Sequence, residues 1–149
     1  MSVMGVPKFE RFFRLAAGLD VDKEDLKRYS DFVGEKLYDL LVVAQANAQA
    51  NGRDVIQPSD LPVTKGLQER IHEFRRLDEE VDLQPILVQL ATWPPLDVTV
   101  SEETESRLPA VVGGLSVALA RTFRILDPDL KNPQTTQWDR SSDLMSLLL

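Results

Sequence analysis

Apolar residues recur at helical spacing along most of this chain. Within segment 8–17 they lie three or four positions apart, which predicts a short amphipathic helix that Gly18 ends. A longer pattern of the same kind covers 23–50, and Asp22 is placed to cap the first turn of this second helix. The pair at 51–52, Asn followed by Gly, favours the left-handed backbone turn that ends helices. The chain therefore opens with a short helix and a long one.

The segment after the long helix predicts a brief extended piece and a third helix. Residues 54–57 are suited to a short strand, and the Pro-Ser pair at 58–59 is typical of a helix start. We expect this helix to reach about Arg76, with Pro62 accommodated in its first turn, where no helical hydrogen bond is lost. The acidic run 79–82 then indicates a solvated joint between two parts of the chain.

The order of elements then repeats. Residues 85–92 predict a short apolar helix, which the Trp-Pro-Pro sequence at 93–95 terminates. Ser101 is placed to cap a second long helix over 102–126. A last short helix is expected to open at the Ser-Asp-Leu of 142–144, which repeats the same three residues after the first long helix.

Each repeat thus consists of a short helix, a link, a long helix, a loop and a further short helix. The first repeat covers 6–78 and the second covers 83–149. The links are alike as well, because Leu-Asp-Val occurs at 19–21 and again at 96–98. A chain of 149 residues has the size of one ordinary domain, so we expect the two halves to share one compact core.

Helices in the order short, long, short, joined by brief extended links, resemble the histone fold. The likeness to archaeal histones is closest at 52–61, which reads Gly-Arg-Asp-Val-Ile-Gln-Pro-Ser-Asp-Leu. In that family an Arg after the long helix pairs with an Asp at the next helix start, and the resemblance implies that Arg53 and Asp60 form this structural clamp. A bidentate Arg–carboxylate pair is strong. The alternative is a surface Arg beside an ordinary helix-capping Asp, which contributes little.

The whole chain, from about residue 6 onward, resembles a group of bacterial single-chain proteins with two histone folds and no assigned biochemical role. This resemblance implies an all-α protein in which two tandem histone-fold halves are clasped as an intramolecular pseudodimer. The second half has no recognisable clamp, because Asp143 matches in position whereas Lys131 is too far upstream and Arg140 too near. A single half exposes a wide apolar face on its long helix, so two halves must pair, and one chain removes the cost of association.

Histone dimers bind DNA through basic residues in their loops and at their first helices, so the resemblance raises the question of DNA binding. Here the loop positions are acidic, since the first link carries Asp20 and Asp22 and the second loop continues from Arg53 to Asp54. The link at 96–98 carries a further Asp. Carboxylates at these positions repel phosphates and remove most of the nonspecific affinity.

One basic pattern favours DNA. Lys8, Arg11 and Arg14 are spaced by three on the first predicted helix, and together with Arg53 they form the candidate DNA-binding set. The alternative is a solvated face opposite the Phe-rich side of that helix. The leading interpretation is therefore a noncatalytic histone-like interaction or assembly module, and the second is a nucleoid-associated DNA-binding protein.

Composition favours the leading interpretation. The chain has 17 Lys and Arg against 24 Asp and Glu, a formal net charge of −7, and 43% hydrophobic residues. Such an acidic surface keeps a protein soluble but opposes binding to a phosphate backbone. We therefore expect a protein partner or self-association. The apolar segment 144–149 is suited either to the core or to a partner.

The residue types also limit the chemistry. The chain has no Cys and a single His, His72, so we expect no thiolate nucleophile, disulfide framework or multi-histidine metal site. It contains no phosphate-binding Gly-rich loop or nucleophile elbow, and its acidic pairs lack the residue order of a calcium loop. We expect no enzyme activity, cofactor, metal or small-molecule substrate.

The sequence carries no targeting pattern that we recognise. Residues 1–7 lack the basic and apolar regions of a signal peptide, and no window approaches the ~18 apolar residues of a membrane span. The expected location is the cytoplasm, with association with the nucleoid as the alternative.

Overall fold

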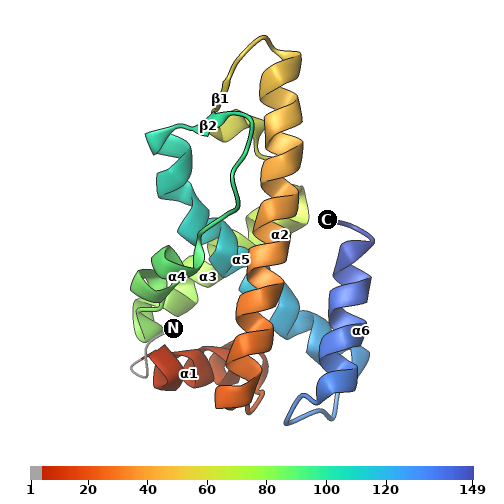
Figure 1. Cartoon of the computed structure of the whole chain (residues 1–149). Coiled ribbons are helices and arrows are strands. Elements are labelled where there is room, and N and C mark those ends of the chain that lie inside the picture. Colours follow the sequence, from red (N-terminus) through yellow and green to blue (C-terminus); the bar gives the residue numbers. More distant parts are fainter. Residues whose placement is uncertain (1–4) are drawn as a thin grey trace.

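The computed structural model describes residues 5–149 and consists mainly of helices (Figure 1). Residues 1–4, at the start of the segment assessed for a signal peptide, lie outside the described residues. The elements in chain order are α1 (Gly5–Ala17), α2 (Lys23–Ala50), β1 (Val55–Ile56), the 3₁₀ turn η1 (Pro58–Asp60), α3 (Lys65–Val81), α4 (Gln84–Leu90), β2 (Thr99–Val100), α5 (Glu102–Leu126) and α6 (Thr135–Ser146). The prediction of an all-α protein is confirmed, since each strand has only two residues.

Both long helices begin and end where the sequence predicts. The Asp22 side chain accepts hydrogen bonds from the backbone N–H groups of Glu24 (2.9 Å) and Asp25 (3.2 Å). The Asp25 carboxylate in turn accepts from the Asp22 N–H at 3.0 Å, and this reciprocal capping fixes the first turn of α2. Ser101 Oγ caps α5 by accepting from the Thr104 N–H at 3.1 Å. The caps satisfy backbone donors that have no partner within a helix.

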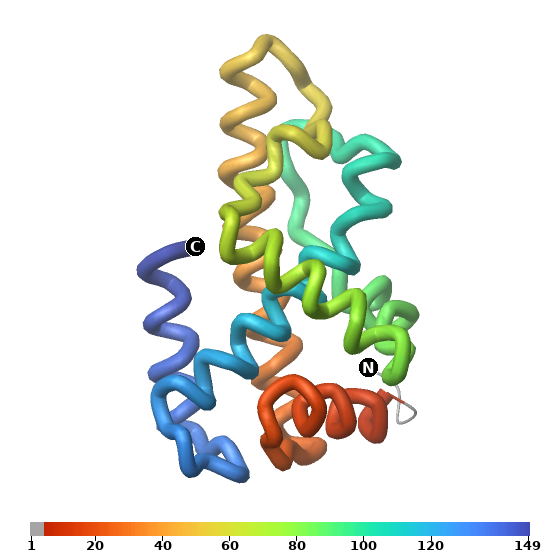
Figure 2. Tube along the Cα trace, turned by 180° about the vertical axis from the view of Figure 1, so that it is seen from behind, coloured from red at the N-terminus to blue at the C-terminus, as the bar shows by residue number. Residues whose placement is uncertain are grey.

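The two long helices cross at the centre of the molecule (Figures 1 and 2). Where they meet, the Tyr29 hydroxyl of α2 and the Ser116 hydroxyl of α5 lie 2.7 Å apart, and both side chains are buried. The rings of Phe9 and Phe13 on α1 lie 5.1 and 5.7 Å from the Tyr29 ring. The main cluster of buried side chains contains residues from every helix, so elements of both repeats share one core.

Two consecutive glycines let α3 approach α5 closely. A Cβ atom at Gly113 would lie 2.4 Å from the ring of Phe74, and one at Gly114 would lie 2.6 Å from Ile71 Cγ1. Real side chains do not tolerate such distances, so α5 needs glycine at both positions. The helix stays continuous through this pair and through Pro109, and Figure 2 shows that it changes direction along its length.

The third helix begins later than the sequence predicts. Pro58 opens only the 3₁₀ turn η1. The helix α3 starts after Thr64, whose hydroxyl accepts from the Leu67 N–H at 3.2 Å. Pro62 explains the difference, because the residue before a proline is forced into extended backbone, and Leu61 has φ −65° and ψ 127°. Pro62 therefore separates η1 from α3 instead of lying in a first helical turn.

The acidic run 79–82 forms the end of α3 and its cap, so it is helical as far as Val81, and its three carboxylates are exposed where α3 leads into α4. The helix continues to Val81, which is buried in the core, and it ends at Asp82 in the left-handed conformation with φ 54°. The Asp78 carboxylate then accepts from the Leu83 N–H at 2.6 Å, which leads directly into α4. One apolar residue among the carboxylates is enough to anchor this run.

The last helix begins earlier than the sequence predicts. α6 starts at Thr135 instead of Ser142, and the Gln137 side chain fixes its first turn by accepting from the Gln134 N–H at 2.8 Å. The early part of α6 packs on the core through Trp138, which is buried. A single tryptophan among polar residues creates little apolar periodicity, whereas the leucines at the end of the chain create more. The predicted start at Ser142 rested on the repeated Ser-Asp-Leu triplet, which lies in the middle of α6.

The helix α5 is apolar enough, by length and composition alone, to cross a membrane. An 18-residue window in it has a mean hydropathy of 1.3, and 67% of that window is buried inside the protein. The expectation that no segment of the chain is long and apolar enough to span a membrane is therefore wrong for α5. The contacts of α5 with the other helices account for its apolar side chains.

Candidate functional site

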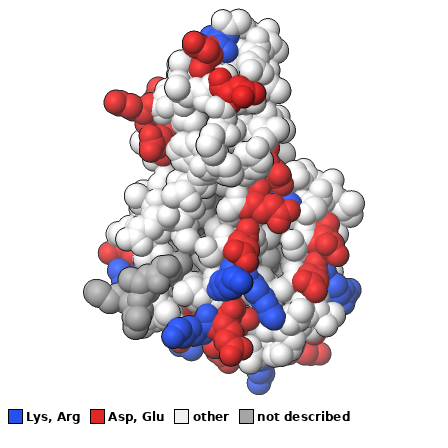
Figure 3. Space-filling model, viewed as in Figure 1, with Lys and Arg blue, Asp and Glu red and all other residues white. Residues whose placement is uncertain are grey.

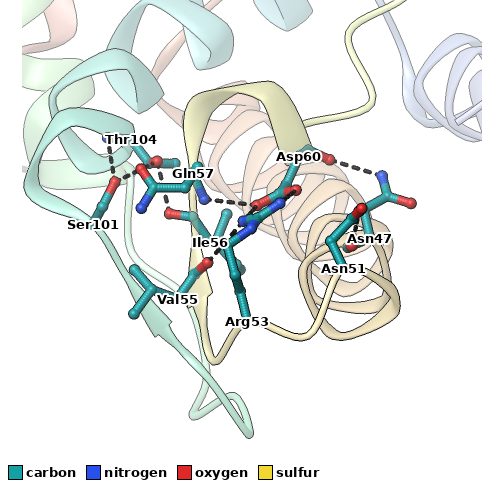
Figure 4. A network of polar contacts seen from close by, with 9 residues as sticks. All are labelled: Asn47, Asn51, Arg53, Val55, Ile56, Gln57, Asp60, Ser101 and Thr104. Carbon is teal, nitrogen blue, oxygen red and sulfur yellow. Dashed lines mark hydrogen bonds and ion pairs between the residues drawn. The ribbon is translucent and has the colours of Figure 1, made fainter.

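The loop after α2 is fixed by an ion pair (Figure 4). The Arg53 guanidinium donates from Nη1 to Asp60 Oδ2 at 2.5 Å and from Nη2 to Oδ1 at 2.7 Å, so the pair is bidentate. Asp60 Oδ2 also accepts from the Gln57 N–H at 2.8 Å, and the Asp60 side chain is only 3% exposed. The hydrogen bonds from Arg53 hold the pKa of the Asp60 carboxyl below its usual value. The two residues that the archaeal-histone resemblance pairs thus lie in contact.

The same loop is tied to both long helices (Figure 4). The Asn47 side chain on α2 donates to the Asp60 C=O at 2.9 Å. On the other side, the Thr104 hydroxyl on α5 donates to the Ile56 C=O at 2.9 Å and lies 2.7 Å from Ser101 Oγ. Thr104 is fully buried, so its hydroxyl needs such a partner. These contacts hold the loop in one position relative to α2 and α5.

The strands β1 and β2 join the loop after α2 to the link before α5. They pair in parallel, with Val55 opposite Thr99 and Ile56 opposite Val100. The Thr99 N–H donates to the Asp54 C=O at 3.1 Å. Segments from the two repeats therefore meet at this end of the molecule.

A second contact joins the other ends of the long helices. The Asp20 N–H, in the link before α2, donates to the Lys131 C=O, in the loop after α5, at 2.6 Å. Next to it, Arg124 in the last turn of α5 donates to the Ala17 C=O from Nε (3.0 Å) and Nη2 (2.7 Å) and to the Pro128 C=O from Nη1 (2.6 Å). At both ends of the crossed helices, a link from one repeat contacts a loop from the other.

Arg124 is part of no motif in the sequence, whereas the archaeal-histone resemblance pointed to Asp143 for a second clamp. Asp143 lies within α6 and is exposed, because that helix begins well before this position. Arg124 binds backbone carbonyls, which leave no pattern of residue types in a sequence. The one available signal is its position in the last turn of α5, where a cation is favoured by carbonyl groups without helical partners.

The four residues of the candidate DNA-binding set do not come together. Lys8, Arg11 and Arg14 lie on α1, beside the start of α2, whereas Arg53 follows the end of α2 (Figure 1). The 28 residues of α2 span about 40 Å at about 1.5 Å per residue. The set therefore forms no single basic patch, and it occupies two ends of the molecule.

Most of these cations have carboxylate partners. Lys8 Nζ lies 3.5 Å from Asp82 Oδ2, and Arg14 Nε lies 3.6 Å from Asp20 Oδ1. Arg53 is bound to its own carboxylate, as described above. A cation that already has a carboxylate partner must give it up, or share it, to bind a phosphate.

Acidic side chains accompany the basic ones on the surface. Figure 3 shows red and blue groups interspersed on the face of Figure 1, with acidic groups following α2. The link and loop residues Asp20, Asp54 and Asp97 are exposed as well. Their charge opposes contact with a phosphate backbone.

Two buried charged side chains lie between α2 and α6. Trp138 Nε1 donates to Asp25 Oδ1 at 2.9 Å, and burial raises the pKa of the Asp25 carboxyl above its usual value. The Lys36 side chain is 1% exposed, and its Nζ lies 2.7 Å from Ser146 Oγ and 3.4 Å from Asp39 Oδ2. Both charges have partners, as buried charges require, and we interpret them as connections that position α6.

His72 and the acidic residues within 5–149 form no cluster that could bind a metal ion. His72 lies on the exposed side of α3. Within residues 5–149, no group of three or more His, Asp or Glu side chains is arranged to hold such an ion. The loops at the two ends of the crossed helices are therefore the candidate functional site.

Comparison with known proteins identifies the family. A family model described as "Domain of unknown function (DUF1931)" matches residues 9–146. The chain belongs to this family. An uncharacterised protein of Aquifex aeolicus (strain VF5) is 30% identical to this DUF1931 chain over 111 residues, which cover 74% of the chain but only 65% of that protein. A second uncharacterised Aquifex protein is 28% identical over 141 residues, which cover 86% of the chain and 82% of that protein.

Two solved structures are similar to the DUF1931 chain. A crystal structure of a protein from Thermus thermophilus has 56% sequence identity and a TM-score of 0.85, covering 96% of this chain and 97% of that one. A 1.9 Å crystal structure of an Aquifex aeolicus protein has 23% identity and a TM-score of 0.86, covering 100% of both chains, and it supports the fold alone. Neither the family description nor the names of these relatives assign a biochemical role.

Proposed function

We propose that this DUF1931 protein is a noncatalytic, histone-like interaction or assembly module, in which two histone-fold halves, 6–78 and 83–149, are paired as an intramolecular pseudodimer. The element order supports the pairing, because α1, α2 and α3 are followed by α4, α5 and α6 with a long helix at the centre of each triplet. The long helices bury their apolar sides in one shared core. Neither half would have this core alone.

The strongest support is the reciprocal contact at the two ends of the crossed helices. At one end the link before α5 contacts the loop after α2, through the Thr99 N–H and the Asp54 C=O. At the other end the link before α2 contacts the loop after α5, through the Asp20 N–H and the Lys131 C=O. A two-fold relation between the halves requires both contacts.

The charges favour a protein partner over DNA. The bidentate contact of Arg53 with Asp60 uses the guanidinium to hold a loop, and the neighbouring exposed residue is Asp54. Nonspecific affinity for DNA rises with the number of phosphates that cations neutralise. With carboxylates beside the basic residues, few phosphate contacts are left to supply that affinity.

A fluorescence-anisotropy titration of the full chain against a labelled duplex tests the non-DNA part of the proposal. At ~150 mM salt, where nonspecific DNA-binding proteins have dissociation constants of about 10⁻⁴–10⁻⁶ M, we expect no saturable binding up to about 100 µM protein. Saturable binding with a dissociation constant below about 1 µM would overturn this part.

A second candidate function is DNA binding through α1. It is favoured by the exposure of Arg11 and Arg14. The Arg14 side chain is 64% exposed although Asp20 lies next to it. If DNA is bound, Arg11→Glu should weaken binding several-fold, whereas Lys27→Glu, which makes the same charge change on α2, should not. Equal effects of the two substitutions would count against an α1 contact and point to the net charge alone.

A further inference from the structure

A groove lies between the first half of α2 and the link that follows α4. Its volume is about 500 Å³. Its α2 side carries Asp31, Gly34, Glu35 and Tyr38, and its link side carries Trp93. The four α2 residues have the spacing i, i+3, i+4 and i+7, so they lie on one face of that helix. The link runs beside α2 in Figure 1, and the Asp97 N–H in the link donates to the Gln45 side chain of α2 at 2.8 Å, which fixes the two sides relative to each other.

The carboxylates of the groove are poorly balanced by cations. None of the residues that line the groove is basic. Among residues 5–149, Asp31 takes part in no ion pair, and Glu35 pairs with Lys36 alone, whose Nζ lies 3.8 Å from Glu35 Oε1. The Lys36 side chain is only 1% exposed, so it cannot reach a ligand in the groove. Arg28, one turn before Asp31, donates to the Thr135 hydroxyl at 2.5 Å. The groove therefore presents negative charge to a ligand.

Gly34 leaves space between these carboxylates and the aromatic rings. Glycine in the interior of a helix is destabilising relative to alanine, so it needs a reason to be there. The two glycines of α5 have one, because Phe74 and Ile71 occupy the space of their side chains. A Cβ at Gly34 would meet no atom within 4 Å, and its backbone is not left-handed. Neither packing nor backbone conformation within the chain explains Gly34, whereas a ligand in the groove would.

We propose that this groove binds an arginine side chain of a partner protein. Tyr38 and Trp93 supply rings of the kind on which a planar guanidinium stacks. Asp31 and Glu35 supply the acceptors for its N–H groups. Arginine fits better than lysine, because its five donors lie in one plane and can reach two carboxylates while the plane stays against a ring. This inference gives the partner of the interaction module a chemical identity and therefore rests on the proposed function.

Heteronuclear NMR of the full chain tests the groove with a defined probe, the capped peptide acetyl-Gly-Arg-Gly-amide. The peptide should shift the amide signal of Gly34 and the indole signal of Trp93, with a dissociation constant of about 1 mM, as expected for a ligand of this size. Citrulline in place of the arginine keeps the shape but removes the charge, so it should weaken binding about 10-fold or more. Lysine in its place should weaken binding several-fold. Free L-arginine should also bind more weakly, because its own carboxylate is repelled by those of the groove.

Two outcomes of this titration overturn the inference. One is an arginine peptide that leaves both signals unshifted at about 20 mM, and the other is a citrulline peptide that binds equally well. A lysine peptide or free arginine that binds as tightly as the arginine peptide overturns the assignment to an arginine side chain in a protein.

Gly34→Leu tests the space in the groove without endangering the fold. The new side chain starts in open space, so the melting temperature should not fall, but it fills the groove and should raise the dissociation constant about 10-fold or more. Gly66→Leu on α3 is the matched control, since a Cβ there also meets no atom within 4 Å, and it should leave binding unchanged. Equal binding by the wild type and Gly34→Leu would place the peptide elsewhere and contradict the inference.

A second pair of variants tests the charges. Asp31→Asn together with Glu35→Gln keeps the shape of both side chains and should weaken binding about 10-fold or more, because the guanidinium loses its charged acceptors. Glu79→Gln together with Glu80→Gln removes the same charge from the exposed end of α3 and should have little effect. Equal effects of the two double variants would show that net charge alone attracts the peptide, which overturns the site.

Failure of this inference is distinguishable from failure of the proposed function. If the arginine peptide does not bind while the duplex titration also shows no binding, the interaction module stands and its partner is held elsewhere. If the duplex binds tightly, the non-DNA part of the proposed function fails, whatever the peptide does at Gly34.

Discussion

The close contact between α3 and α5 leads to an unusual expectation for Gly113→Ala. Alanine normally stabilises the interior of a helix relative to glycine by about 1 kcal/mol, so the substitution should be favourable in isolation. Here the new Cβ would lie 2.4 Å from two atoms of the Phe74 ring. Phe74 is fully buried, so its ring cannot turn aside into solvent.

The magnitude follows from these two opposing effects. Overfilling a packed core costs about 1–3 kcal/mol, and this contact belongs at the upper end because a buried ring meets the new atom. After the gain in helix propensity is subtracted, we expect Gly113→Ala to lower the free energy of unfolding by about 2 kcal/mol. For a chain of this size that corresponds to a fall of about 4–8 °C in the melting temperature.

The chain offers a matched control in the other long helix. A Cβ at Gly34 in α2 would have no atom within 4 Å, so Gly34→Ala should raise the free energy of unfolding by about 0.5–1 kcal/mol. Urea and thermal unfolding followed by far-UV circular dichroism measure both variants. If the two alanines shift the stability in the same direction and by similar amounts, α3 does not approach α5 as described.

Three further expectations concern the polar contacts. Asp60→Ala should lower the free energy of unfolding by about 2 kcal/mol at neutral pH, because three hydrogen bonds are lost while Arg53 can still reach water. The difference in stability between the wild type and Asp60→Ala should shrink as the pH falls below 3.8, the usual pKa of an Asp, because the pKa of Asp60 in the folded protein is lower still. Urea titrations that give the same difference at every pH would refute this expectation. The pKa of Asp25 is raised instead, so the wild type should lose stability relative to Asp25→Asn as the pH rises from about 4 to 7, and the opposite trend would contradict the burial of Asp25 against Trp138. Finally, Arg124→Ala should speed hydrogen exchange in the last turn of α1 and leave exchange near β1 unchanged, whereas equal acceleration at both places would point to global destabilisation.

The parts of the fold that were predicted correctly are those fixed by local sequence. α2 and α5 have caps at Asp22 and Ser101, uninterrupted apolar seams and clear stop signals, so their bounds could be read directly. The pair of Arg53 and Asp60 was accessible through a family resemblance, and each member is a charged residue beside a turn. Local signals of this kind act within one or two helical turns.

The parts that were missed depend on distant contacts. α6 begins at Thr135 because Trp138 reaches the core and the Asp25 carboxylate on α2, and nothing near Trp138 in the sequence indicates this. Lys36 is buried with Ser146 and Asp39 beside its ammonium group, although lysine is a residue type that is usually exposed. Sequence periodicity reports which side of a helix is apolar, and it does not report which polar residues a neighbouring helix will cover.

The two halves contact each other at both ends of their long helices. Because the chain has no Cys, pairs of introduced cysteines can report on these contacts without interference. One pair, Val55→Cys with Thr99→Cys, spans the strand contact, and the other, Asp20→Cys with Lys131→Cys, spans the opposite end. Disulfides form readily only when the two Cα atoms lie within about 7 Å.

Mild oxidation of each variant, followed by non-reducing electrophoresis, gives the answer. We predict that both pairs close within single chains, and that the mixed pair Val55→Cys with Lys131→Cys, whose members belong to opposite ends, stays reduced. Closure at only one end, or closure of the mixed pair as readily as the matched ones, would contradict the pairing of the two halves.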